Sequence, residues 1–423
     1  MKIAVIGSGG REHAIIKLIK KNPKCELLYA IPGNGGTASD AINVPIKATD
    51  MEEITNFCIK ESIDYVIVAP DDPLVLGLCD MLDKHGIKSF GPNKAAAIIE
   101  GSKKFAKDFM KRHNIPTASY ESFSNMEEAL QYVENQDKKI VIKASGLALG
   151  KGVIISDTKE ESISAIKSIM KDKKFGNAGN EIVIEEFLEG PEVSVLTFTD
   201  GDTVKLMISS MDHKRALDGD IGLNTGGMGV IAPNPYYTDE VCKECMDKIF
   251  LPTIKGLKNE NRKFKGCLYF GLMLTKAGPK VIEYNARFGD PEAQCILPLL
   301  ENDLLDIMLA TTEGNLQNVE IKFSNKNSCT LVAASKGYPA KYDKGYKIDF
   351  PKDMDNIFIA GTKLEDGEQI TCGGRVLAIT ETGDTLEEAI DKAYKNIKRI
   401  SFSNMFYRKD IGRKALDGEK HNG

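Results

Sequence analysis

The chain has 423 residues, of which 42% are hydrophobic and 28% are charged, and its formal net charge is −5. This composition is typical of a globular protein of roughly two to four domains, and it lacks the basic excess of a nucleic-acid-binding surface. No apolar run approaches the roughly 20 residues that span a bilayer, and the N-terminus lacks a signal-peptide core. We therefore expect a cytoplasmic protein that binds neither nucleic acid nor membranes.

The nine cysteines are an odd number in a long chain, so they do not indicate a disulfide framework. Cys242 and Cys245 form one CxxC pair, but no second pair or nearby histidine completes a zinc site. Their spacing also fits one face of a helix that we expect over residues 238–258. A structural zinc is therefore disfavoured.

The first hundred residues alternate between apolar strands and helices. This alternation predicts a doubly wound parallel sheet, in which ligands bind at the carboxyl ends of the strands. The expected strands are 2–6, 26–31, 64–69 and 87–90, and the expected helices are 11–21 and 73–84. We end this domain near residue 100.

The run Gly7-Ser8-Gly9-Gly10 follows the first strand, where a phosphate-binding turn would lie. A dinucleotide fingerprint would need a third glycine at position 12, which is Glu12, and an acid at the end of the second strand. That strand runs into Pro32-Gly33-Asn34 instead. NAD binding by an oxidoreductase is therefore disfavoured against an anion site for a phosphorylated substrate, with tight strand–helix packing as the structural alternative.

Beyond residue 100 the pattern predicts a second α/β unit and then a small α+β unit. Helices are expected at 102–113, 126–135, 158–172 and from about 290, and strands at 140–144, 181–187, 193–199, 203–210, 267–275 and 280–287. From residue 328 onward the chain mixes strands with one helix at about 385–399.

Lys143 interrupts an apolar strand and is followed by the glycine-rich run 145–152. A buried ammonium group is costly unless it is paired, and bound phosphate oxygens would supply the partner. The glycines allow a loop to close its N–H groups over phosphates, although the spacing is not that of a P-loop. An exposed edge lysine beside a glycine-rich hairpin is the alternative interpretation.

Residues 281–292 carry the most informative pattern. Alternation along a strand places Ile282, Tyr284 and Ala286 toward a core. The opposite face then carries two oxygen ligands and one fixed positive charge, from Glu283, Asn285 and Arg287. Mg²⁺ takes few protein oxygens, and arginine pairs with phosphate or carboxylate oxygens. A polar strand face at a sheet edge is the alternative.

Three further segments are polar enough to face a ligand. Residues 185–188 end a strand and offer backbone groups to a base edge, although an amphipathic strand end has the same pattern. Residues 212–215 form a charge run, in which His213 has no nearby Ser or Cys to indicate a triad. Residues 224–229 form a glycine-rich loop that could close over a substrate.

Together these motifs resemble the ATP-grasp superfamily and, within it, the glycinamide ribonucleotide synthetase family, also called phosphoribosylamine–glycine ligases. The matching strings extend from the first strand nearly to the C-terminus. They are Gly7 to His13, Pro32 to Thr37, Glu100 to Lys103, Lys143 to Gly152, Asp212 to Arg215, Asn224 to Gly229, Glu283 to Glu292 and Arg408 to Gly412.

The resemblance implies an α/β and α+β multidomain fold. It comprises an N-terminal Rossmann-like substrate domain (1–100), a two-lobed ATP-grasp domain (101–325) with a mobile lid at about 120–190, and a small C-terminal α+β domain (326–423). The implied reaction joins glycine to 5-phospho-D-ribosylamine through glycyl phosphate, with ATP and Mg²⁺ or Mn²⁺. No covalent nucleophile is needed, so catalysis would rest on positioning and charge neutralisation.

The resemblance also implies roles for individual residues. Contacts to ATP are expected from Lys103, Lys143, Gly146, Gly150, Lys151, Gly152, Glu185, Leu188 and Glu192. Metal binding is expected from Glu283 and Asn285, and catalytic roles from Arg287, Asp212 and Lys214. Substrate contacts are expected from Gly9, Gly10, Gly33, Asn34, Asp71, Arg215 and Asp290.

The chain departs from the family pattern at three points. Ser145 stands where an aspartate is common, and Asp71 stands at a glutamate position. Many ATP-grasp relatives also place a metal carboxylate on the strand before the E-x-N strand, where residues 269–273 offer none. We therefore expect Asp290 or Glu292 to complete the metal shell.

Two other functions stay open at this point. One is a nucleotide-binding sensor of the same fold without turnover, and the other is an ATP-grasp ligase for a different carboxylate. The sequence is compatible with a monomer or a weak homo-oligomer that acts on small molecules.

Overall fold

Five parallel strands in the order β3-β2-β1-β4-β5 form the first sheet of the computed structural model, which describes residues 1–148 and 150–416. The side chains of residues 3–6 in the central strand are shielded from solvent on both faces, as a sheet covered by helices on both sides requires. The strands are β1 (Lys2–Gly7), β2 (Leu27–Pro32), β3 (Ile42–Asn43), β4 (Tyr65–Val68) and β5 (Lys88–Phe90). The doubly wound prediction is confirmed.

The helices of this unit are α1 (Gly10–Ile19), α2 (Met51–Glu61), α3 (Asp71–Leu76), α4 (Leu78–Lys84) and α5 (Lys94–Gly101). The single helix predicted at 73–84 is therefore two helices. Gly77 separates them with a φ of +100°, a conformation that a side chain disfavours and that ends α3.

A large antiparallel sheet follows, in the order β11-β10-β16-β17. Its strands are β10 (Glu192–Thr199), β11 (Val204–Leu206), β16 (Gly266–Thr275) and β17 (Gly278–Asn285). The helices α6 (Lys103–Arg112), α9 (Asp239–Cys245) and α10 (Leu251–Asn259) accompany it, and the segment η4 (Met246–Phe250) joins the last two. Cys245 is buried in this core, so the CxxC spacing follows a helix face as expected.

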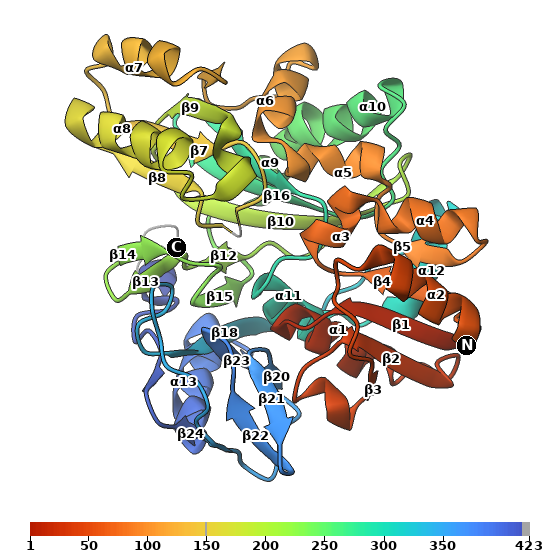
Figure 1. Cartoon of the computed structure of the whole chain (residues 1–423). Helices are drawn as coiled ribbons and strands as arrows, with labels where there is room; N and C mark the ends of the chain where they lie inside the picture. Colours follow the sequence, from red (N-terminus) through yellow and green to blue (C-terminus); the bar gives the residue numbers. More distant parts are fainter. Residues whose placement is uncertain (149, 417–423) are drawn as a thin grey trace.

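A smaller lobe with its own hydrophobic core lies at the upper left of Figure 1. Its sheet has the order β6-β9-β7-β8, with the strands β6 (Tyr120–Phe123), β7 (Ile140–Ala144), β8 (Val153–Ser156) and β9 (Ile182–Glu186). The helices α7 (Met126–Glu134) and α8 (Lys159–Ile166) cover one face, and α8 continues into η2 (Lys167–Lys171).

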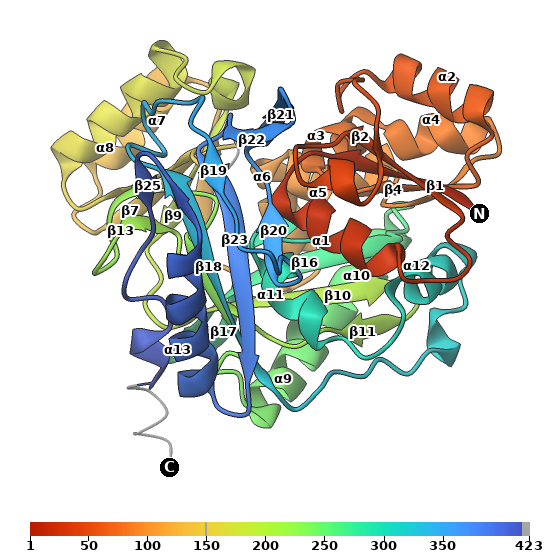
Figure 2. The same ribbon diagram turned by 90° about the horizontal axis from the view of Figure 1, so that it is seen from below.

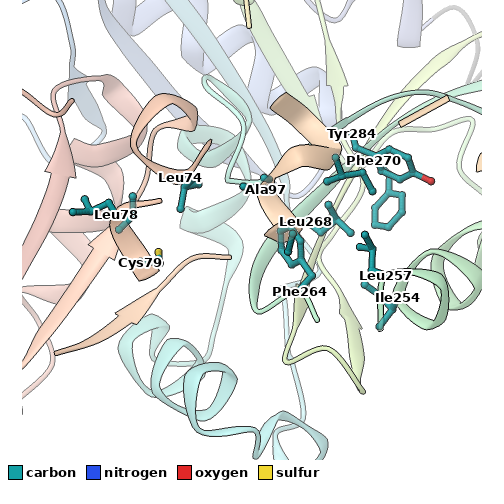
Figure 3. Packing of buried hydrophobic residues seen from close by; sticks show 14 of the residues in the cluster. Leu74, Leu78, Cys79, Ala97, Ile254, Leu257, Phe264, Leu268, Phe270 and Tyr284 are labelled. Atoms are coloured by element: carbon teal, nitrogen blue, oxygen red, sulfur yellow. The ribbon is translucent and has the colours of Figure 1, made fainter. Parts of the chain in front are cut away.

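The first sheet and the large sheet share one hydrophobic cluster. Figure 3 shows Leu74 and Leu78 on one side of it and Leu268 and Phe270 on the other, with Ala97 of α5 between them. Segments almost 200 residues apart thus bury a common apolar surface, which is the dominant favourable contribution to their association. By contrast, the buried residues of the small lobe form a separate cluster.

The C-terminal sheet contains strands from two distant parts of the chain. Its order is β12-β15-β18-β23-β20, and β25 pairs with β18. The strands are β12 (Met211–Asp212), β15 (Gly229–Ala232), β18 (Asn327–Ser335), β20 (Ile357–Ile359), β23 (Arg375–Gly383) and β25 (Met405–Phe406). Figure 2 shows α13 (Leu386–Asn396) against the long strands β18 and β23. The polar segment that precedes β15 is thereby anchored on this sheet.

The remaining elements are short. The hairpin of β13 (Arg215–Leu217) and β14 (Ile221–Asn224) projects beside β12, and α11 (Glu292–Ile296) and α12 (Leu304–Glu313) follow the large sheet. Further two-stranded pairs are β19 (Ile348–Asp349) with β24 (Ser401–Phe402) and β21 (Thr362–Glu365) with β22 (Glu368–Thr371). Among the described residues, no helix has both the length and the apolar character needed to cross a membrane.

A buried arginine fastens the β13–β14 hairpin to the C-terminal segment. The side chain of Arg408 is 1% exposed, and its guanidinium donates to Asp410 at 2.7 and 2.8 Å and to Asp220 at 2.8 Å. It also donates to the backbone carbonyl of Arg215 at 3.0 Å. Removing one member of such a buried network leaves the other charges unpaired.

We expect Arg408→Met to lower the free energy of unfolding by about 3 kcal/mol, the usual cost of breaking a buried ion pair from one side. Urea denaturation would measure the change. Arg399→Met removes the same charge from an exposed position and serves as the control. If the two variants lose equal stability, the network does not hold the hairpin.

Candidate active site

One cavity of about 820 Å³ is lined by residues of the small lobe, the large sheet and the C-terminal sheet. It brings together most of the residues singled out from the sequence, although they come from segments far apart in the chain. Those that line it are Asp71, Lys103, Lys143, Gly150, Lys151, Gly152, Glu185, Leu188, Glu192, Asp212, Lys214, Arg215, Glu283, Asn285, Arg287 and Asp290. Gly9, Gly10, Gly33, Asn34 and Gly146 are not among its lining residues.

Strand β17 presents Glu283 and Asn285 to the cavity, and Arg287 follows directly after the strand. One detail of the predicted alternation is wrong. The pairing with β16 shifts between Gly271 and Leu272, and this β-bulge moves Val281 into the core in place of Ile282. Ile282 therefore lines the cavity.

Arg287 is held by groups from two different segments. One terminal nitrogen lies 3.0 Å from a carboxylate oxygen of Glu100 and 3.2 Å from the side-chain oxygen of Asn285. Glu100 also accepts the backbone N–H of Ala286 at 2.6 Å. Burial raises the pKa of Glu100 to about 7, against the opposing charge of Arg287. Glu100 was named from the sequence only as part of a matching string, so its role in holding Arg287 was missed.

Lys143 is buried, and its partner in the structure is a carboxylate. Its Nζ lies 2.9 Å from Glu185 Oε1, while Lys107 Nζ lies 2.9 Å from Oε2 of the same side chain. Burial alone would raise the pKa of Glu185, but the charges of Lys143 and Lys107 outweigh it and hold that pKa below its ordinary value. Glu185 therefore compensates two cations that face the cavity, and Lys107 was missed.

Lys214 joins two other carboxylates of the cavity. Its Nζ lies 3.2 Å from Glu192 and 3.6 Å from Glu283. Burial opposes the charge of Lys214, but these carboxylates outweigh it and raise its pKa. In turn, burial would raise the pKa of Glu283, whereas the cations around it, led by Lys214, lower it. Glu283 is thus kept ionised, which a metal ligand requires.

The glycine-rich loop begins against α6. Lys103 Nζ donates to the carbonyl of Gly146 at 3.2 Å, and burial lowers the pKa of Lys103. Farther along the loop, the Nζ of Lys151 lies 5.7 Å from the centre of the Tyr338 ring, in cation–π contact with the C-terminal unit. Leu149, at the centre of the predicted loop, lies outside the described residues.

The turn at the N-terminus of α1 is capped by its own chain. The N–H of Gly9 donates to Glu12 at 2.6 Å, and Arg11 Nε donates to the other carboxylate oxygen at 2.6 Å. The anion-binding position predicted at Gly9 and Gly10 is therefore filled by a side-chain carboxylate. Glu12 at the third helical position is a capping-box signal that the sequence already contained.

Asn34 is likewise committed to the fold. Its side-chain nitrogen donates at 2.9 Å to the carbonyl oxygens of Ser8 and Ile359, and its oxygen accepts the N–H groups of Gly36 and Thr37. All four bonds stabilise the turn after β2 and its contact with the C-terminal unit. A substrate contact of Gly33 or Asn34 stays a prediction.

Asp290 contacts both the N-terminal unit, through Arg11, and the C-terminal sheet, through Arg375. It pairs with Arg375 at 3.3 Å, accepts from Gln294 at 2.8 Å and accepts the N–H of Arg11 at 3.3 Å. Burial would raise its pKa, but Arg375 and Arg11 outweigh that effect and lower it. Arg375 and Arg11 also line the cavity and were missed, because each belongs to a segment distant from Asp290 in sequence.

The donor set on β17 fits a hard divalent cation. Glu283 and Asn285 supply one carboxylate and one amide oxygen, which Mg²⁺ can combine with water and phosphate oxygens. No group of three His, Cys, Asp or Glu side chains suited to a metal occurs among residues 1–148 and 150–416. The pair is therefore an incomplete shell, as expected where the substrate supplies ligands. Of the two residues predicted to complete it, Asp290 is already engaged by Arg375.

Two lobes that enclose a lysine-lined cavity, with a glycine-rich loop on one side and an E-x-N strand on the other, define an enzyme of the ATP-grasp class. The comparison with known families agrees. Three profiles match the chain: the N domain of phosphoribosylglycinamide synthetase over residues 1–100, its ATP-grasp (A) domain over 101–293 and its C domain over 328–414. The chain belongs to the phosphoribosylglycinamide synthetase family.

Individual relatives support this assignment. A phosphoribosylamine–glycine ligase of Clostridium acetobutylicum is 47% identical over 98% of this chain and 100% of its own length. A bifunctional purine biosynthetic protein of Schizosaccharomyces pombe is also 47% identical, and the chain spans 54% of its length. The crystal structure of a phosphoribosylamine–glycine ligase from Thermotoga maritima has a TM-score of 0.86 at 33% identity and covers 97% of this chain and 100% of its own. A biotin carboxylase domain from Hydrogenobacter thermophilus shares the fold, with a TM-score of 0.75 at 16% identity. The match covers 99% of this chain and 98% of that domain.

His213 also lines the cavity, but its ring has a structural role. Its Nδ1–H donates to the carbonyl of Gly229 at 3.2 Å, and its Nε2 accepts the N–H of Gly412 at 3.1 Å. The ring is therefore neutral, since a protonated imidazole has no acceptor nitrogen. Burial and the nearby charge of Arg408 lower the pKa of His213 to about 4.

This lowered pKa predicts a loss of stability in acid. His213 binds a proton near pH 6.5 in the unfolded chain but only near pH 4 in the folded chain. The neutral ring therefore contributes stability above pH 6.5, and this contribution is lost as the pH falls toward 4. Between pH 7 and 5, the unfolding free energy of the native protein should fall by about 2 kcal/mol more than that of His213→Gln. Urea denaturation at both pH values checks this, with exposed His85→Gln as control. Equal slopes for His213→Gln and the native chain would contradict it.

Proposed function

We propose that this enzyme joins glycine to 5-phospho-D-ribosylamine, with cleavage of ATP to ADP and phosphate, and forms glycinamide ribonucleotide for purine synthesis. The observation that carries the proposal is the convergence, in one cavity, of Lys103 and Lys143 with Glu283, Asn285 and Arg287 of the E-x-N-x-R pattern. Cations together with oxygen ligands and an arginine are what transfer of a phosphoryl group to a carboxylate needs. The names of the full-length relatives support the choice of substrates.

ATP would enter between the small lobe and the large sheet. Lys103 and Lys143 would neutralise its phosphates, and the loop with Gly146, Gly150, Lys151 and Gly152 would cover them. Backbone groups of Glu185 and Leu188 would form hydrogen bonds with the adenine edge, and the carboxylate of Glu192 would accept hydrogen bonds from the ribose hydroxyls. Glu192 is now paired with Lys214, so nucleotide binding would compete with that ion pair.

Mg²⁺ or Mn²⁺ would be held by Glu283 and Asn285. When bound, the ion would neutralise phosphate charge and polarise the phosphoryl group that is transferred. Asp290 is engaged by Arg375 and Gln294, so water and phosphate oxygens would supply the remaining ligands. Arg287, oriented by Glu100, would steady the γ-phosphate and then the acyl phosphate.

The chemistry would proceed in two steps. A glycine carboxylate oxygen attacks the γ-phosphorus of ATP, the bond to the β-phosphate oxygen breaks, and glycyl phosphate and ADP result. The amine of phosphoribosylamine then attacks the acyl carbon, inorganic phosphate leaves, and the nitrogen loses one proton. Neither step needs a covalent bond to the protein, and positioning alone supplies several kcal/mol of such a barrier, of order 7–11 at best.

Phosphoribosylamine would approach from the N-terminal unit. Asp71, Arg215 and Asp290 line the cavity on its substrate side, and we retain Gly9, Gly10, Gly33 and Asn34 as residues that shape the approach. The proposed domains are 1–100, 101–325 and 326–423, with residues 120–190 as a lid. Ser145, in place of the usual aspartate, accepts the N–H of Lys104 at 3.2 Å and anchors the start of the loop.

ADP release, measured with ATP and Mg²⁺ and with phosphoribosylamine generated in situ, tests the function directly. Release should require both glycine and the amine, and glycinamide ribonucleotide should form in equal amount. Glu283→Gln should lose at least about 100-fold in turnover while keeping the native unfolding temperature, because it removes a metal ligand and its charge. Glu320→Gln, at an exposed site, is the control.

ATP that binds without being cleaved would instead indicate a sensor of this fold. Turnover that proceeds with another acid and not with glycine would indicate a ligase for that acid. Native turnover in Glu283→Gln would remove the metal assignment while leaving the reaction intact.

The separate core of the small lobe predicts that it moves as a unit. Without nucleotide, backbone amides of residues 120–186 near the cavity should exchange hydrogen faster than those of β18. A non-hydrolysable ATP analogue with Mg²⁺ should slow hydrogen exchange in the lobe at least about fivefold and leave exchange in β18 unchanged. Equal exchange with and without the analogue, at a concentration shown to bind, would argue against a lid.

A further inference from the structure

Asp212 and Glu292 are two cavity carboxylates that form no ion pair with any residue the structure describes. Oδ1 of Asp212 is shielded from solvent and has no hydrogen-bond partner among the described residues. Glu292, at the start of α11, is 4% exposed, and like Asp212 it forms no ion pair within the described part of the chain. Both line the cavity. Burial and the repulsion between the two raise the pKa of Asp212, and burial raises that of Glu292.

The ammonium group two residues after Asp212 belongs to Lys214, and it is committed elsewhere. Lys214 Nζ pairs with Glu192 at 3.2 Å and with Glu283 at 3.6 Å. An unpaired buried carboxylate costs several kcal/mol, so a protein keeps one where a ligand supplies the missing charge. The group missing at Asp212 is therefore a small cation that donates hydrogen bonds.

The loop behind Asp212 packs closely against its carboxylate. A Cβ at Gly227, whose φ is +117°, would lie 2.6 Å from Asp212 Oδ1 and 2.5 Å from Pro291 Cδ. Arg375 fixes this loop, because it donates to the carbonyls of Gly226 at 2.9 Å and Asp290 at 2.6 Å. Asp212 is thus held in place before a ligand arrives, which limits the ordering cost of binding.

We propose that Asp212, assisted by Glu292, binds the ammonium group of the amino acid whose carboxylate is phosphorylated. This inference rests on the proposed function, since it assigns one end of the glycine substrate. The carboxylate end would then point toward Arg287 and the metal ligands, which line the same cavity. An ammonium group donates hydrogen bonds, which the unpartnered Oδ1 of Asp212 lacks among the described residues.

The subsite would also protect the reaction. An amine held as ammonium has no free electron pair, so glycine bound there cannot attack a glycyl phosphate. The amine of phosphoribosylamine, outside this pocket, stays unprotonated and is the nucleophile. One pair of carboxylates would thereby separate the two amines of the reaction.

The test compares glycine with glycolate, which has a hydroxyl in place of the ammonium group. In Asp212→Asn, KM for glycine should rise at least about 30-fold, as expected when one member of a buried charge pair is removed. KM for ATP should stay within about threefold. The ratio of kcat/KM for glycine to kcat/KM for glycolate should fall by about the same factor as the KM for glycine rises. Only glycine loses an ionic contact in this variant.

Asp83→Asn, on an exposed face of α4, is the matched control and should keep the native preference. The unfolding temperature of Asp212→Asn should equal or exceed that of the native protein, because a charged group with a shielded, unpartnered oxygen is replaced by a neutral one. If Asp212→Asn does not fold, Glu292→Gln is judged by the same ratio of substrates.

Two failures can be told apart. If the native enzyme does not use glycine, the proposed function fails before any variant is made. The other failure is a native enzyme that uses glycine and a variant that keeps its preference for glycine over glycolate, or loses kcat/KM for both acids equally. In that case the ammonium subsite is wrong and the function stands.

Discussion

Buried charge is the constraint on which the site depends. Several cations that face the cavity have a carboxylate close by, since Glu185 lies between Lys143 and Lys107 and Glu283 lies beside Lys214. Without these partners the cost of burying ammonium groups would be several kcal/mol each. Polyphosphate binding therefore exchanges one set of counter-charges for another, and the net affinity is smaller than the number of lysines implies.

Much of the fold follows from local patterns in the sequence. The apolar runs of β1 and β4 and the alternation along β17 each predict an element where one exists. The exceptions have local backbone causes. Gly77 divides one predicted helix into α3 and α4, and the bulge in β17 exchanges Val281 and Ile282 between core and cavity. Neither is visible in a periodicity, because each depends on one residue's conformation or on a partner strand.

The site was less predictable than the fold, because a sequence does not show which polar groups are already satisfied. Asn34 and the N–H of Gly9 look available in a glycine-rich turn, yet Asn34 makes four bonds within the fold and the N–H is capped by Glu12. Conversely, Glu100 and Arg375 act on Arg287 and Asp290 from distant segments. Only the folded chain brings such pairs together.

The C-terminal unit is part of the site, since β12 and β15 belong to its sheet and carry the chain on either side of residues 213–228. Asp212 is thereby fixed to the same sheet as Arg375, which holds the backbone of Gly226 and of Asp290. The loop behind Asp212 and the backbone of Asp290 are thus held by one guanidinium. A shift of the C-terminal sheet would displace Asp212 and Asp290 together, and a misplacement of about 1 Å at a reacting centre can cost a hundredfold in rate.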